Sequence, residues 1–119
     1  MTVRRMKTYS GERGIVYQYY FLESQPQRRF WGCSGTAFRF RVTSDRQNFV
    51  VAEVVVEEAA LKAWEKAHGR ALVEQEQYAA AKMALFRAFD ESDRPEELSH
   101  IRVSESNIDS LLEPLHLDE

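Results

Sequence analysis

The chain has 119 residues, of which 44% are hydrophobic and 12% aromatic, and its formal net charge at pH 7 is −3. This composition supplies enough apolar side chains for a core, so it excludes a wholly disordered chain, and the length is that of one domain. The small net charge does not by itself indicate a nucleic acid or a membrane as a partner.

The charge is unevenly distributed along the chain. Residues 1–89 contain 14 Lys and Arg against 9 Asp and Glu, whereas residues 90–119 contain 2 against 10. We therefore predict a single α+β domain over residues 1–90 and an acidic C-terminal extension over residues 91–119. The opposite charges allow the extension to dock on the domain or on a second copy, and a solvated tail is the alternative.

Cysteine content and hydropathy limit the chemistry and the location. Cys33 is the only cysteine, so the chain can form no intramolecular disulfide and no cluster of thiolates for zinc. The three histidines stand too far apart in the sequence for a metal-binding pattern. The apolar stretches are shorter than the ~20 residues of a membrane helix. We predict a cytoplasmic protein with no metal, no cofactor and no membrane contact.

Three segments have the residue pattern of β-strands, namely residues 15–23, 36–43 and 49–56. The first is rich in Tyr and Phe, the second alternates apolar and charged side chains, and the third is β-branched. Residues 24–29 contain Pro26 and are polar, which predicts a loop. Residues 44–48 form a cluster of turn-favouring side chains, which predicts a hairpin between the last two strands.

The register of this hairpin follows from the position of one charge. If Glu53 shared a face with Phe38 and Phe40, an unpaired carboxylate would be buried at considerable cost. The other register places Glu53 on the face of Arg39 and Arg41 and leaves the opposite face apolar. We predict the second register.

Two helices are predicted after the strands. Residues 57–68 open with an acidic turn and stop before Gly69, and residues 74–90 combine an aromatic arc with an alanine-rich side. In the acidic extension, residues 100–104 are a candidate for a short edge strand and residues 107–113 for a short helix. The resulting fold is an α+β domain, with a three-stranded antiparallel sheet, a candidate short fourth edge strand from the tail, and two helices packed on one face.

Two side chains are candidates for chemistry. Lys82 lies in the middle of the aromatic arc of residues 74–90, where burial would lower its pKa and suit it to bind an anion or to form a Schiff base. The simpler interpretation is a lysine whose stem packs on aromatic rings while its amine reaches water. Cys33 lies between Gly32 and Gly35 and is a candidate nucleophile. The simpler interpretation is a small side chain in a glycine-rich bend.

Basic and aromatic side chains also gather in the first half of the chain. They form a candidate surface for a protein partner or for single-stranded nucleic acid, made of Arg28, Arg29, Trp31, Arg39 and Arg41. Glu53 would neutralise part of it, and the chain carries no established nucleic-acid-binding motif.

We therefore weigh three functions. The leading hypothesis is a small non-catalytic binding or interaction module that acts through a protein partner or self-association as a homodimer, with residues 91–119 or a second chain covering the outer sheet face. The alternatives are a nucleic-acid-binding domain and, with less support, an enzyme that uses Lys82 or Cys33.

Overall fold

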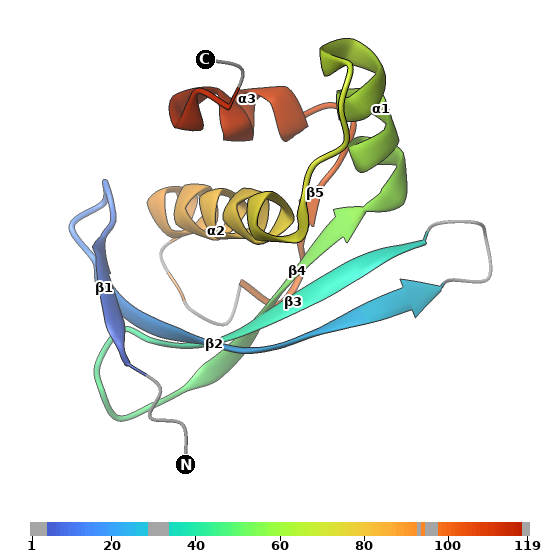
Figure 1. Ribbon diagram of the computed structural model, residues 1–119. Helices are drawn as coiled ribbons and strands as arrows, with labels where there is room; N and C mark the ends of the chain where they lie inside the picture. The colour runs from blue at the N-terminus through green and yellow to red at the C-terminus, as the bar shows by residue number, and fades with distance from the viewer. Residues whose placement is uncertain (1–4, 29–33, 93, 95–97, 118–119) are drawn as a thin grey trace.

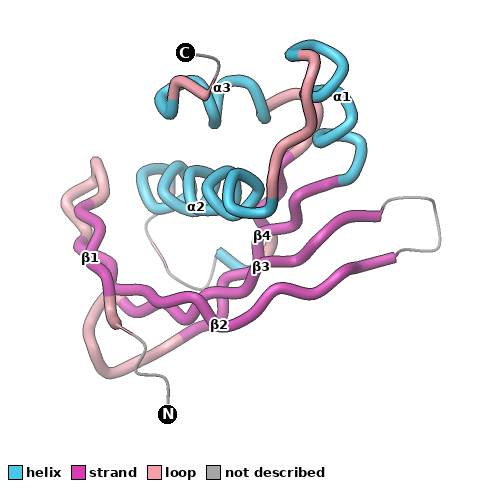
Figure 2. Tube along the Cα trace, viewed as in Figure 1, coloured by secondary structure: helices cyan, strands magenta, loops and turns pink. Residues whose placement is uncertain are grey.

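The computed structural model describes residues 5–28, 34–92, 94 and 98–117. In the described part the chain forms a five-stranded sheet and three α-helices (Figures 1 and 2). In chain order the elements are β1 (Lys7–Ser10), β2 (Val16–Arg28), β3 (Ser34–Thr43), β4 (Val50–Glu57), α1 (Glu58–His68), α2 (Glu74–Glu91), β5 (Ile101–Val103), α3 (Ile108–Leu112) and the 3₁₀ helix η2 (Glu113–Leu115).

The predicted three-stranded antiparallel sheet with two helices is wrong, although the α+β class is right. The strands follow the order β1-β2-β3-β4-β5; the first four pair antiparallel, and β5 pairs with β4 in parallel. The sheet is therefore mixed, and it curls into a half-barrel around α2 (Figure 1). The four-residue strand β1 was not predicted, whereas the three-residue strand β5 falls within residues 100–104, the candidate edge strand of the tail. Both short strands are held by their neighbours rather than by a strong pattern of their own.

The predicted hairpin register is confirmed. Arg39 pairs with Glu53, and Phe38 pairs with Val54 on the opposite face of the sheet. The inward face of β3 and β4 is buried and apolar, and it forms the floor of the core. Gly35 lies so close to β4 that an added Cβ would stand 2.5 Å from the Val56 carbonyl oxygen, so this position requires glycine.

Strand β2 is longer than predicted, because residues 24–28 continue the strand instead of forming a loop. Pro26 pairs with Thr36 in the ladder with β3. On its other side, β2 pairs with β1 only as far as Tyr19, so the rest of that edge is open and tolerates a residue without an N–H group. The register shifts between Phe21 and Glu23, which makes Leu22 the extra residue of a β-bulge.

The helices lie on the concave side of the sheet. Helix α2 rests in the curl, and α3 lies on the side of α2 that faces away from the sheet (Figure 1). Helix α1 follows β4 directly and ends at Gly69, whose φ of 77° is the left-handed conformation expected of a glycine after a helix. The crossover α1–α2 carries the chain from β4 to the parallel strand β5.

Residues of the acidic extension share the main core. Leu98, Val103, Ile108, Leu111 and Leu112 are all buried in the same apolar cluster as Phe40, Trp64 and Phe89. The described part of the extension therefore adds strand β5 to the edge of the sheet and covers α2. It leaves the outer sheet face uncovered. Among the described residues, no helix is both long enough and apolar enough to cross a membrane.

Candidate functional site

Two lysines from opposite ends of the sequence meet at the open side of the half-barrel. Lys7 pairs with Tyr19 in the ladder between β1 and β2, so both side chains lie on the concave face toward α2. On α2, Tyr78, Lys82 and Phe86 follow one another at four-residue spacing and form one stripe. The strand and the helix thus bring the amine of Lys7 to that of Lys82.

The Lys82 ammonium is half-buried on aromatic rings. Its Nζ lies 5.8 Å from the ring centroid of Tyr78 and 5.8 Å from that of Phe86. Burial lowers the pKa of Lys82 below its ordinary value, and repulsion by the Lys7 ammonium and their close contact lower it further. In the described part of the chain, no carboxylate forms an ion pair with either lysine. The pair is therefore a concentration of positive charge without its own counter-ion.

Two tyrosine hydroxyls add polar groups beside the lysines. Tyr19 is only 4% exposed, and burial together with the nearby Tyr78 hydroxyl raises its pKa. Burial likewise raises the pKa of Tyr78. Neither hydroxyl has a hydrogen-bond partner among the described residues. Both remain available to donate to a ligand.

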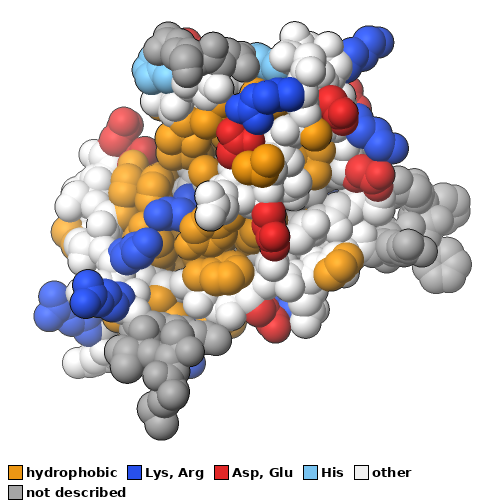
Figure 3. Space-filling view, in the orientation of Figure 1, with side chains coloured by type: hydrophobic (Ala, Val, Ile, Leu, Met, Phe, Trp, Pro, Cys, Tyr) orange, Lys and Arg blue, Asp and Glu red, His pale blue; other side chains and the backbone are white. Residues whose placement is uncertain are grey.

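The surroundings of these four groups are aromatic. Tyr9 stacks on Phe86 with 4.5 Å between ring centroids, and Phe21 meets Tyr78 edge-on at 5.1 Å. These rings are only partly buried. Figure 3 shows the result as an apolar surface over α2 and the adjoining sheet, with basic side chains set into it. We name the set Lys7, Tyr19, Tyr78 and Lys82, with its rings Tyr9, Phe21 and Phe86, the lysine-pair site.

The position of Lys7 depends on how β1 is held against α2. The Tyr9 hydroxyl donates to both carboxylate oxygens of Asp90, and the backbone N–H of Glu12 donates to Asp90 Oδ1 at 3.0 Å. Burial and the bond to Asp90 raise the pKa of Tyr9 to about 12. The last turn of α2 thus fixes the hairpin that carries Lys7.

The arginines predicted to form a partner surface are distributed differently. Arg39 lies on the convex face and is held between Glu23 and Glu53, at 2.9 and 3.0 Å, so its charge is balanced. Arg41 lies on the same face, with its guanidinium 4.8 Å from the ring centroid of Phe49. Arg29, Trp31 and Cys33 lie outside the described residues, as does the side chain of Arg28.

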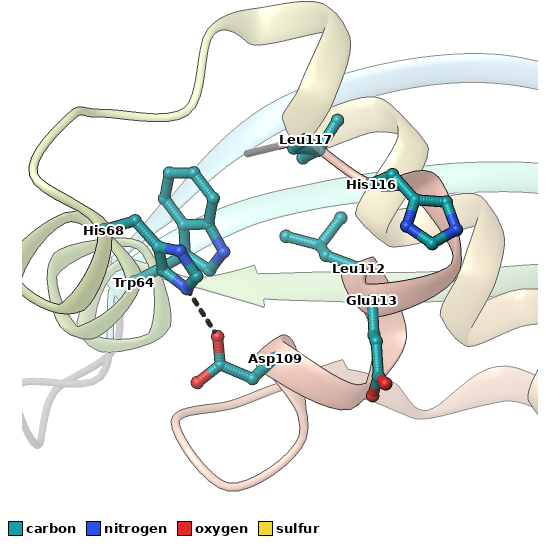
Figure 4. A pocket seen from close by; sticks show the side chains of 7 residues that line it. All are labelled: Trp64, His68, Asp109, Leu112, Glu113, His116 and Leu117. Carbon is teal, nitrogen blue, oxygen red and sulfur yellow. Dashed lines mark hydrogen bonds and ion pairs between the residues drawn. The ribbon is translucent and has the colours of Figure 1, made fainter. Parts of the chain in front are cut away.

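A second candidate lies between the ends of α1 and α3 (Figure 4). There a cleft of about 300 Å³ is lined by Trp64, His68, Asp109, Leu112, Glu113, His116 and Leu117. The His68 ring stacks on Trp64, with 4.1 Å between centroids, and its Nε2 lies 2.9 Å from Asp109 Oδ1. This contact joins the acidic extension to α1. In the described part of the chain, no three His, Cys, Asp or Glu side chains come together as a metal site.

The sequence singled out Lys82 as a candidate, but gave no sign that Lys7 and Tyr19 lie beside it. Its aromatic surroundings were visible in the helical spacing of residues 78, 82 and 86. Lys7 was missed because β1 was not predicted. A hairpin built on the turn between Gly11 and Gly14 would have aligned Lys7 with Tyr19.

The comparisons with known proteins add no relative. A scan against protein-family models and searches of curated proteins and of solved structures find no match to this chain.

Proposed function

We propose that this chain is a small cytoplasmic binding module that holds an anionic small molecule at the lysine-pair site. The observation that carries the proposal is that the Lys82 ammonium lies over the rings of Tyr78 and Phe86 close to Lys7, while neither lysine forms an ion pair with a carboxylate of the described residues. Two like charges that are close together and partly desolvated repel each other, and a bound anion relieves that repulsion. The tyrosine hydroxyls supply two further donors, and the rings supply an apolar surface.

The location proposed with this function is the cytoplasm, because a reducing compartment suits a chain whose single cysteine has no partner within it.

The test uses an anionic aromatic dye, 8-anilinonaphthalene-1-sulfonate, titrated by fluorescence at low and at high salt. Lys7→Met and Lys82→Met remove one charge each and keep an unbranched side chain, and each should weaken binding about tenfold. The matched control is Lys62→Met, because Lys62 is exposed on α1 and pairs with Glu58 instead. Circular dichroism verifies that all variants are folded. Equal dye affinity for the parent and both site variants would contradict the proposal, as would a parent that binds no dye at low salt.

A second function, self-association as a homodimer, is favoured by the convex sheet face. Val16 and Val51 are each 50% exposed there, and Phe49 with Arg41 above it lies beside Val51. We propose that a second copy covers this face, since Phe49 and Val51 expose neighbouring apolar side chains there and exposed apolar patches mark interaction surfaces. Sedimentation should give a dimer that Val51→Glu dissociates and that Val73→Glu, at an exposed position before α2, leaves intact. A parent chain that stays monomeric at high concentration rules this function out.

A further inference from the structure

The geometry points to a phosphate monoester with a flat apolar body, such as an aryl phosphate, as the class of ligand for the lysine-pair site. This inference rests on the proposed anion-binding function and deepens it. It separates one doubly charged ligand class from the monoanions, free phosphate and polymeric anions that the same function would admit.

The first argument is the number of charges. Lys82 holds its ammonium over the rings of Tyr78 and Phe86, and the Lys7 ammonium beside Tyr19 is near enough to contribute to lowering the Lys82 pKa, so the site presents two positive charges. A carboxylate or a sulfonate carries one negative charge and leaves the second ammonium unbalanced. A phosphate monoester carries about −1.5 to −2 at pH 7 and has three acceptor oxygens. Its charge matches that of the pair, and separate oxygens can accept from each ammonium.

The second argument is the supply of further donors. The hydroxyls of Tyr19 and Tyr78 have no partner among the described residues, and the two tyrosines are close enough to influence each other electrostatically. Tyr19 is almost fully buried. Its hydroxyl oxygen is not among the buried polar atoms that lack a partner in the described residues, so it reaches the surface and can donate to an acceptor oxygen of a ligand. A phosphate has more acceptor positions than the lysines alone require, whereas a sulfonate lacks the second charge.

The third argument is the surface around the charges. The rings of Phe21, Tyr78, Phe86 and Tyr9 extend to both sides of Lys82. Inorganic phosphate would leave this surface in water. A ligand with a flat apolar body covers it and gains from the removal of apolar area from water and from ring contacts.

The fourth argument concerns size. A nucleic-acid strand needs a row of cations along its backbone. On the convex face Arg39 is neutralised by Glu23 and Glu53, and the concave site concentrates its positive charge at one point. A small ligand fits that arrangement better than a polymer.

The test compares three probes by isothermal titration calorimetry on the full chain. 1-Naphthyl phosphate has the ring and two charges, naphthalene-1-sulfonate has the ring and one charge, and inorganic phosphate has the charges without the ring. We expect the aryl phosphate to bind about tenfold more tightly than either of the others. Because the second pKa of a phosphate ester is about 6, its affinity should rise between pH 5 and pH 7.5, whereas that of the sulfonate should change little.

Variants locate the effect. Lys7→Met and Lys82→Met each leave one charge, so the preference for naphthyl phosphate over naphthalenesulfonate should fall to about one, and Lys62→Met should retain it. Tyr78→Phe should weaken the aryl phosphate and leave the fold intact, because that hydroxyl bonds to no described residue.

The outcomes separate the inference from the function beneath it. If the three probes bind with similar affinity and the lysine variants weaken all of them, the site binds anions in general and the inference fails alone. If none of the probes binds, the inference and the proposed function fail together. A single-stranded oligonucleotide that binds more tightly than naphthyl phosphate, with loss in the lysine variants, overturns the inference in favour of a polymeric ligand.

Discussion

The hydroxyl of Tyr9 donates to both carboxylate oxygens of Asp90, at 2.9 and 3.1 Å, and so connects the first strand to the last turn of the long helix. Tyr9 also stacks on Phe86, one turn earlier on α2. Because Lys7 lies two residues before Tyr9 on the same face of β1, this contact also places one half of the lysine pair.

The first prediction concerns the strength of this connection. Tyr9→Phe keeps the ring stack and removes the hydrogen bond to a charged acceptor, so the free energy of unfolding should fall by about 1–2 kcal/mol. Urea denaturation measures the loss. Tyr20→Phe is the control, because Tyr20 makes no hydrogen bond to a described residue and should change stability by less than about 0.5 kcal/mol. Equal stability of the parent and Tyr9→Phe would show that the bond is not formed in solution.

The same bond predicts a dependence on alkaline pH. Burial of Tyr9, together with the bond and the charge of Asp90, raises the pKa of Tyr9 from the ordinary 10.0 to about 12. The stabilisation is therefore complete below pH 10 and is lost as pH rises through about 12. Thermal unfolding of the parent and of Tyr9→Phe should show a constant difference below pH 10 that closes above it. A difference that stays constant up to pH 12 would argue against the assignment, and the other tyrosines cancel because both proteins contain them.

The turn between β3 and β4 is predicted to lose part of its contribution to stability in acid. Backbone and side-chain bonds from Asn48, followed by the Gln47 backbone and Thr43, hold the pKa of Asp45 well below its ordinary value of 3.8. This contribution is present above that value and disappears as pH falls further. Asp45→Asn keeps an acceptor and loses the charge, so its melting temperature should be below that of the parent at neutral pH and should approach it in acid. Asp45→Ala, which has no acceptor, should melt lower than Asp45→Asn at every pH.

Substitutions at two glycines distinguish the cost of a steric contact from the cost of an unfavourable backbone conformation. At Gly35 an added Cβ meets the Val56 carbonyl, so Gly35→Ala forces β3 and β4 apart and should cost about 3 kcal/mol. At Gly14 nothing lies within 4 Å, and only the positive φ of 85° opposes a side chain. Gly14→Ala should therefore cost about 1 kcal/mol. Chemical denaturation of both variants gives the ranking, and a smaller loss at Gly35 would contradict the strand pairing.

The acidic extension is predicted to contribute to the stability of the whole domain. Leu111 on α3 is 2% exposed, and Leu111→Ala should destabilise the chain by about 2–5 kcal/mol. Leu115 is 37% exposed in η2, and Leu115→Ala should cost less than about 0.5 kcal/mol. Unfolding of the sheet and of the extension should coincide in fluorescence and circular dichroism. An unchanged stability for Leu111→Ala would indicate that α3 is detached in solution.

Sequence reasoning was most successful where one face of an element had to be buried. Glu53 could not enter the core, and that single constraint correctly set the register of β3 on β4. Gly69 likewise marked the end of α1. In β1 only Tyr9 enters the core, so this strand carries too little local pattern to be recognised. Strand β5 was recognised as a candidate edge strand at residues 100–104, but its parallel pairing with β4 was not predicted. The loop predicted from Pro26 was wrong because Pro26 lies in a strand whose edge is open. Whether an edge is open depends on the tertiary structure and cannot be read from the local sequence.

Only the part of the candidate site that lies on α2 could be predicted from the sequence, for the same reason. Tyr78, Lys82 and Phe86 belong to one helix, so their proximity follows from helical spacing. Lys7 and Tyr19 reach them only through the curl of the sheet, and the sequence contains no local sign of that curl.

The bulge at Leu22 makes β2 longer than β3 where the two strands pair, and this difference in length bends the sheet. Over the span where β2 pairs with β3, β2 uses one residue more than its partner, as the outer lane of a bend is longer than the inner one. Glu23 already pairs with Arg39, so deleting Leu22 would leave a regular ladder with the same partners but would straighten the ribbon. The hairpin that ends in β1 would then swing away from α2, which means that the distance between Lys7 and Lys82 is set by one residue that belongs to neither element.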